Sequence, residues 1–220
     1  MKEKRPYYSI DKLSQSKEKI KKSEFVGRAF PIENADQAEK ILSELRIAEK
    51  EASHHPFALI SGLSSAEKRF SDDGEPQGTA GKPILDLIEQ RELTQVLVVV
   101  SRYFGGIKLG APGLLRAYRS SAKQALDKAG RALFIPAQVI HLSIPYDFLG
   151  KIDYYLREQG IDEGSRSFSD KVSLSLILAE PSQARIKEDI MEMTSGQLSW
   201  EKGQGTWVKK ILDEAWEKQI

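Results

Sequence analysis

The chain has 220 residues, of which 40% are hydrophobic and none is cysteine. This length suits one large domain or two small ones, and the composition is sufficient for a buried core. The lack of cysteine excludes disulfides, thiol catalysis and cysteine-ligated metal. No apolar run approaches the length of a membrane span, and the lysine-rich start has no apolar signal segment. We therefore expect a cytoplasmic protein without membrane contacts.

A net charge of +1 conceals a strong asymmetry along the chain. Residues 1–22 contain eight Lys or Arg against three Asp or Glu, and residues 101–131 contain seven against one. Residues 23–100, in contrast, contain eight against fourteen. A basic patch of this kind is a plausible surface for an anionic partner, and the acidic remainder of the chain argues against indiscriminate coating of nucleic acid.

The residue pattern predicts two α+β domains in succession. Residues 1–22 are expected to be a basic lead-in, partly helical and partly irregular. The first domain, 23–131, is expected to have the order β-α-β-β-α-β-α. Its predicted strands are 25–32, 57–60, 68–71 and 94–101, and its helices follow Asn34 as N-cap, Pro83 in a first turn, and Gly113. In the middle helix, the expected core residues are Ile84, Leu85, Leu87 and Ile88.

A short linker, 132–136, is expected before the second domain, 137–202. Here the order β-α-β-β-α-β predicts a ferredoxin-like fold. The expected elements are a strand 138–145, a helix capped by Asp147 and ended by Gly160, a hairpin 161–178, a helix 183–194 closed by Gly196, and a strand 197–201. The tail, 203–220, has the apolar spacing of a final amphipathic helix.

The stretch from 97 to 131 carries the clearest chemical signal. A continuous apolar run, 97–100, is typical of a strand buried on both faces. A glycine-rich loop follows, and then a helix with Arg116, Arg119 and Lys123 on one arc. A loop of this kind exposes backbone N–H groups, and the helix N-terminus that follows favours anions. The alternative is a simple turn followed by a solvated basic face.

Two long motifs resemble the IMPACT/YigZ family. They are SDDGEPQGTAGKP at 71–83 and SRYFGGIKLGAPGLLRAY at 101–118. KKSEF at 21–25 and ASHHPFAL at 52–59 also match family positions. The resemblance implies a first domain similar to part of a small-subunit ribosomal protein and a second similar to a domain of elongation factor G. It also implies a role in translation, because eukaryotic members act as translation regulators through protein contacts.

Several other motifs can be set aside. GTAGKP at 78–83 fails as a phosphate loop, because Pro76 replaces the required glycine and Pro83 replaces the required Ser or Thr. No dinucleotide fingerprint can be placed on the glycine loop. His54 and His55 are adjacent in an extended segment, so they point to opposite faces and make a poor metal pair. We expect no cofactor, no metal and no nucleophilic triad.

The acidic turn has two interpretations. Asp72, Asp73 and Glu75 could bind a hard cation, or they could cap the following helix and pair with Arg102 and Lys108. If this turn lies against the glycine loop, the two family motifs form one site. In that case His54, Asp72, Asp73 and Glu75 would provide its second half.

The first functional hypothesis is a non-catalytic, translation-associated regulator that binds RNA, the ribosome or a translation-related protein. The predicted anion-binding or nucleic-acid-binding residues are Arg102, Tyr103, Gly105, Gly106, Lys108, Gly110, Arg116, Arg119 and Lys123, with Tyr103 or Phe104 stacking on a base. The alternative is an enzyme or binder acting on a phosphorylated small molecule, with a divalent metal at the acidic turn. A third hypothesis is a protein regulator whose basic face meets an acidic partner.

Overall fold

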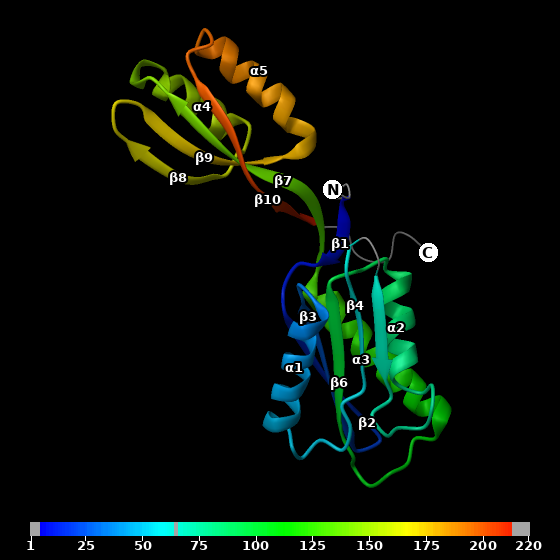
Figure 1. Cartoon of the computed structure of the whole chain (residues 1–220). Helices are drawn as coiled ribbons and strands as arrows, with labels where there is room; N and C mark the ends of the chain where they lie inside the picture. Colours follow the sequence, from blue (N-terminus) through cyan, green and yellow to red (C-terminus); the bar gives the residue numbers. More distant parts are fainter. Residues whose placement is uncertain (1–4, 64–65, 213–220) are drawn as a thin grey trace. The chain divides into compact units, whose positions relative to one another are not determined.

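The structure is a computed structural model that describes residues 5–63 and 66–212. It contains two compact units (Figure 1). The first comprises the described residues up to Leu133, together with Ile211 and Leu212, and the second comprises Phe134–Lys210. Both units combine helices with antiparallel strand pairs, which confirms the predicted two-domain α+β class.

The first unit is built on a sheet with the strand order β2-β3-β6-β4-β5. Its elements are β1 (Tyr7–Ile10), β2 (Ser14–Ile20), β3 (Ser23–Pro31), α1 (Ala35–Ala48), β4 (Phe57–Ser61), β5 (Glu67–Ser71), α2 (Gly81–Gln90), β6 (Val96–Tyr103) and α3 (Ala111–Ala129). Strand β6 lies in the middle, and its neighbours β3 and β4 both pair with it antiparallel. This position explains the continuous apolar run of β6, because both faces of the strand are covered.

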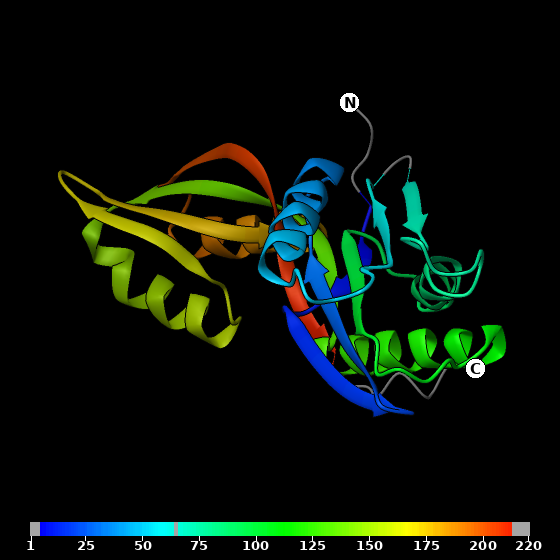
Figure 2. The ribbon, with the colours of Figure 1, turned by 90° about the horizontal axis from the view of Figure 1, so that it is seen from below.

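Helix α1 covers one face of this sheet, and α2 and α3 cover the other (Figures 1 and 2). The two faces carry separate cores. Val96, Val98 and Val100 pack with α2 and α3, whereas Leu97 and Val99 pack with α1. The alternation follows from the two-residue period of a strand. All four predicted core residues of α2, namely Ile84, Leu85, Leu87 and Ile88, are buried.

Local signals place the helices of the first unit. The side chain of Asn34 accepts a 2.9 Å hydrogen bond from the backbone N–H of Gln37, which confirms Asn34 as the N-cap of α1. Pro83 and Pro112 lie in the first turns of α2 and α3, where a missing N–H costs nothing. Helix α3 packs closely on β3 at Gly27, where a Cβ would lie 2.5 Å from the carbonyl oxygen of Ser121.

The helical or irregular lead-in predicted for 1–22 is wrong over the described residues, which form β1 and β2. Strand β2 pairs with β3 along its whole length, from Ser14 opposite Ala29 to Ile20 opposite Ser23. Its inward side chains include serines in place of apolar residues. The hydroxyl of Ser14 donates to the carbonyl of Ala125 at 2.5 Å, so a polar strand still packs on α3.

The second unit has the strand order β10-β7-β9-β8 with two helices, which is the ferredoxin-like arrangement. Its elements are β7 (Arg131–Ile144), a 3-10 turn η1 (Tyr146–Phe148), α4 (Leu149–Glu158), β8 (Glu163–Phe168), β9 (Val172–Ala179), a second 3-10 turn η2 (Glu180–Ser182), α5 (Gln183–Met193) and β10 (Ser199–Leu212). Gly160 and Gly196 have positive φ angles of 60° and 76° just after α4 and α5, as predicted for helix ends.

Two local predictions for the second half of the chain are wrong, and one holds only in part. The boundary between the two units falls after Leu133, inside the expected linker 132–136, but these residues belong to the strand β7. Asp147 lies in the 3-10 turn η1, and no side chain caps α4. The segment 203–212 is part of β10 and is not helical. The rest of the predicted final helix, 213–220, lies outside the described residues.

Candidate functional site

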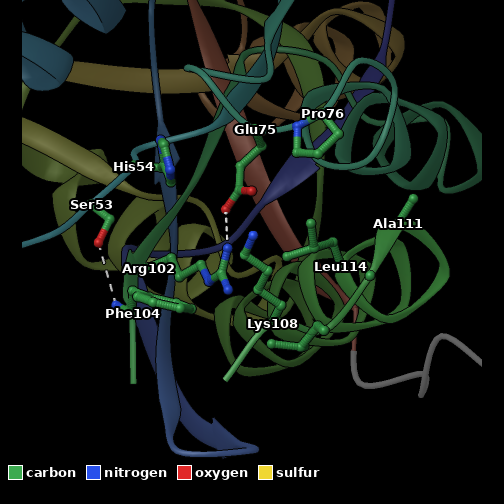
Figure 3. Close-up of a pocket in the computed structure, with 11 residues that line it drawn as sticks. Ser53, His54, Glu75, Pro76, Arg102, Phe104, Lys108, Ala111 and Leu114 are labelled. Carbon is green, nitrogen blue, oxygen red and sulfur yellow. Dashed lines mark hydrogen bonds and ion pairs between the residues drawn. The ribbon is translucent and has the colours of Figure 1, made fainter. Parts of the chain in front are cut away.

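A cavity of about 450 Å³ lies in the first unit, between the acidic turn and the glycine loop (Figure 3). Its lining residues are Ser53, His54, Glu75, Pro76, Arg102, Phe104, Lys108, Leu109, Gly110, Ala111 and Leu114. These residues come from the segment before β4, the turn after β5, the end of β6 and the start of α3. The two sequence motifs, which are separated by α2 and β6, therefore form one concave site.

A buried ion pair forms one wall of this cavity. Nη1 of Arg102 donates to Oε1 of Glu75 at 2.7 Å, and the hydroxyl of Tyr118 donates to the same oxygen at 2.6 Å. The Arg102 guanidinium also lies between the rings of Phe25 and Phe104, 5.6 and 5.3 Å from their centroids. Burial, and then the bond to Glu75, raise the pKa of Tyr118, so its hydroxyl stays protonated as a donor.

The sequence analysis assigned Arg102 to ligand binding. In the structure, its side chain is instead bound within the protein. Its side chain is only 7% exposed, and Glu75 neutralises its charge. Its Nε is nevertheless buried without a hydrogen-bond partner. A buried donor without a partner carries a free-energy cost, so this wall is only partly satisfied by the protein itself.

The carboxylates of the acidic turn act as caps and ion-pair partners. Asp72 accepts hydrogen bonds from the backbone N–H groups of Gly78, Ala80 and Gly81, at 2.8, 3.0 and 2.8 Å. These bonds fix the turn that leads into α2. Within the described chain, no group of three or more His, Asp or Glu side chains is placed to hold a metal ion.

Asp73 completes this part of the site. One of its carboxylate oxygens accepts from the backbone N–H of His55 at 2.7 Å, and the other pairs with Arg46 at 3.3 Å. With Glu75 bound to Arg102, all three acidic side chains are engaged within the protein. Of the two interpretations that the sequence allowed, capping and pairing are the ones that the contacts support.

The glycines of the loop serve different purposes. A Cβ on Gly105 would lie 2.0 Å from the carbonyl oxygen of Lys22, so the absence of a side chain there permits close backbone packing. Gly106 and Gly110 have φ angles of 84° and 73° with no neighbouring atom within 4 Å of a Cβ. They allow the chain to turn from β6 into α3. Lys108 and the first residues of α3 then face the cavity.

Of the predicted basic residues, only Arg102 and Lys108 line the cavity. Lys123 pairs with Asp127 at 3.0 Å, and Arg119 donates to Gln90 at 2.6 Å. Tyr103 does not line the cavity; burial and the carboxylate of Glu49 raise the pKa of its hydroxyl. Lys108 and Arg116 are exposed, and neither forms an ion pair with another described residue. Of these two, Lys108 lines the cavity, whereas Arg116 lies beyond its lining on α3.

The two adjacent histidines point to opposite sides, as predicted. Nδ1 of His54 lies 2.7 Å from the carbonyl oxygen of Asp73, which can only accept, so Nδ1 carries a hydrogen. In the neutral ring, Nε2 of His54 is then a hydrogen-bond acceptor. His55 is buried, with Nδ1 3.0 Å from Oγ of Ser101. Burial lowers the pKa of His55, and Asp73 opposes this shift.

The sequence did not identify every residue of the site. Tyr118 ends the second motif but was not among the predicted site residues, yet its hydroxyl donates to Glu75. The available signal was the tyrosine itself, because a buried hydroxyl needs a partner. Ser53, Pro76, Leu109 and Leu114 lie within the quoted motifs and line the cavity, but none of them was predicted as a site residue. Their contribution depends on the packing of α3 against the sheet, which local sequence does not encode.

Comparison with known proteins identifies the family. Residues 21–126 match the Impact N-terminal domain, and residues 142–197 match a domain of unknown function, DUF1949. The chain is 30% identical to IMPACT family member YvyE of Bacillus subtilis over 207 residues, which cover 94% of this chain and 95% of the relative. The chain therefore belongs to the IMPACT family, as its two motifs predicted.

Two further relatives agree with this assignment. IMPACT family member YigZ of Escherichia coli is 33% identical over 78% of this chain and 83% of its own length. A solved crystal structure described as that of a hypothetical protein aligns over 91% of this chain and 98% of its own, with 28% identity and a TM-score of 0.60. Among the described residues, no helix is both long and apolar enough to cross a bilayer.

Proposed function

We propose that this chain is a non-catalytic, translation-associated regulator that binds RNA, free or on the ribosome, through the cavity of its first unit. The family resemblance supports the link to translation. The support for RNA comes from one juxtaposition at the cavity. A cation, Lys108, and the N-terminus of α3 lie beside Phe104, an aromatic residue with 48% of its surface exposed.

This pairing suits a nucleotide. Backbone N–H groups at a helix N-terminus and a lysine ammonium both stabilise a phosphate. An exposed aromatic ring provides a stacking surface for an unpaired base. The cavity volume of about 450 Å³ is adequate for one such unit. Arg116, exposed near the start of α3, would contact a neighbouring phosphate.

The enzymatic alternative has weaker support. It requires Asp72, Asp73 or Glu75 to hold a metal or to act as a base. Each of these carboxylates is instead bound to backbone N–H groups or to an arginine. None of the three carboxylates of this turn is therefore free to act as a base or to hold a metal. The cavity could still bind a phosphorylated small molecule.

A salt titration with a fluorescent single-stranded RNA tests the proposal. The logarithm of the binding constant should fall linearly with the logarithm of the salt concentration, with a slope of about −0.7 for each neutralised phosphate. Lys108→Ala and Arg116→Ala should each make this slope shallower by about 0.7. Lys151→Ala, on exposed α4 of the second unit, is the matched control.

Three results would decide between the hypotheses. Absence of binding at low salt, or equal slopes for all variants, would refute RNA binding at this cavity. Direct binding of a nucleoside monophosphate without binding of longer RNA would favour the small-molecule alternative. A pull-down from lysate whose bound proteins persist after nuclease treatment would favour an acidic protein partner.

A further inference from the structure

The turn between β2 and β3 has an unusual composition for its geometry. Ile20 pairs with Ser23, so Lys21 and Lys22 form a two-residue hairpin loop. Their φ angles are 44° and 69°, both in the left-handed region. A loop with two positive φ angles is a type I′ turn, which strongly favours Asn-Gly. Two consecutive lysines therefore carry a backbone cost that a common turn sequence would avoid.

This turn is pressed against the glycine loop of the candidate site. The carbonyl oxygen of Lys22 lies so close to Gly105 that no larger residue fits at position 105. The backbone N–H of Gly105 donates to Oγ of Ser23 at 3.2 Å. Phe104, the residue before Gly105, lines the cavity. The tip of the β2–β3 hairpin and the loop between β6 and α3 accordingly lie side by side (Figure 1).

Both lysines are available for an anion. Each is exposed, and neither forms an ion pair with any described residue. Lys17, on the same strand β2, is by contrast paired with Glu24 at 2.7 Å. Between Gly105 and Lys108 the chain spans at most about 11 Å, because consecutive Cα atoms are about 3.8 Å apart. The lysine tip and Lys108 therefore border one short segment of the loop.

We propose that Lys21 and Lys22 form a second phosphate-binding element, which continues the site from the start of α3 across the glycine loop. The ligand is the phosphodiester backbone of single-stranded RNA, so this inference rests on the proposed function. In this arrangement Lys108 and the helix N-terminus bind one phosphate, and the hairpin tip binds the phosphates that follow. The strained turn presents two ammonium groups at this edge.

The decisive variant is Lys21→Asn combined with Lys22→Gly, which supplies the favoured turn sequence and removes both charges. We expect its thermal midpoint to equal or exceed that of the parent. We also expect its salt-dependence slope with single-stranded RNA to be shallower by about 1.4, which corresponds to two phosphates. A second variant, Lys21→Gln with Lys22→Gln, removes the charges without changing the turn to Asn-Gly and should show the same change in slope.

The control is Lys151→Gln with Lys187→Gln, which removes two exposed charges from α4 and α5 of the second unit. Its slope should match that of the parent. If the parent binds RNA and both hairpin variants keep the parental slope, the second phosphate-binding element is refuted while RNA binding stands. If the parent itself does not bind RNA, the proposed function fails, and this inference fails with it.

Discussion

Arg102 and Glu75 join the end of β6 to the acidic turn through a 2.7 Å hydrogen bond between two side chains that are 7% and 4% exposed. Removing one member of a buried ion pair leaves the other charge without compensation. We therefore expect Glu75→Ala to lower the free energy of unfolding by about 3 to 5 kcal/mol. Urea denaturation followed by circular dichroism measures this loss.

The double variant Arg102→Met with Glu75→Leu is the corresponding control. It removes both charges together, so its loss of stability should be clearly smaller than the sum of the losses of the single variants Arg102→Met and Glu75→Leu. Tyr118→Phe, which deletes only the second donor to Glu75, should cost about 1 kcal/mol. Additive losses in the double variant would show that the pair contributes little coupling energy.

The glycine loop offers a matched pair of substitutions. Gly105→Ala places a Cβ 2.0 Å from a backbone oxygen, so either the hairpin tip or the loop must shift. Gly106→Ala meets no atom within 4 Å and pays only for a φ of 84°. We expect a loss of about 1 kcal/mol for Gly106→Ala and a larger one for Gly105→Ala. Thermal unfolding of the two variants side by side tests this order.

Phe104 provides a test of base stacking that is independent of charge. Phe104→Leu should weaken binding of single-stranded RNA by about 1 to 3 kcal/mol, because one stacked base is lost. Its salt-dependence slope should stay unchanged, since no cation is removed. Tyr154→Leu, at an exposed aromatic residue of α4 that is 64% exposed, is the control. Equal affinities for the two variants would exclude Phe104 from the site.

His55 makes stability dependent on pH. Burial lowers its pKa in the folded protein, so between the folded pKa and the ordinary value of about 6.5 the unfolded chain binds more protons. Stability should therefore fall as the pH drops below about 7, and level off below the folded pKa. His55→Gln should show a smaller fall between pH 7.5 and 5.5 in denaturant titrations.

Asp72 organises the turn between β5 and α2. Asp72→Ala removes an acceptor used by three backbone N–H groups, so we expect a loss of about 2 kcal/mol or more. Because Glu75 lies on the same turn, RNA binding should weaken as well. Asp72→Asn keeps one acceptor oxygen and should lie between the parent and the alanine variant in both measurements.

Strong hydrophobic periodicity made much of the fold predictable. The apolar spacing of α2, the uninterrupted run of β6 and the N-cap at Asn34 all gave correct elements. Strand β2 was missed because its buried positions include Ser14 and Ser16, which bond to carbonyls of α3 and produce no apolar alternation. The structure of β2 depends on its pairing with β3 and its packing on α3, which the sequence of β2 alone does not reveal.

The C-terminal part of β10 was wrongly predicted as a helix because its apolar residues have a misleading helical spacing. Trp207, Val208 and Ile211 have helical spacing, yet they lie in a strand that pairs with β7. At the site, the motifs identified most of the cavity, including His54, Glu75, Arg102 and Lys108. They did not reveal which cations are neutralised. That outcome depends on distances between segments that are far apart in the sequence.

The contact between Gly27 and Ser121 has a consequence for the cavity. Ser121 lies ten residues along α3 from Ala111, which is about 15 Å at 1.5 Å per residue. With no side chain on Gly27, the helix packs directly on the strand. Ala111 and Leu114, at the start of the same helix, line the cavity. We expect a bulkier residue at position 27 to displace α3 and change the width of the cavity, although residue 27 itself does not line the cavity.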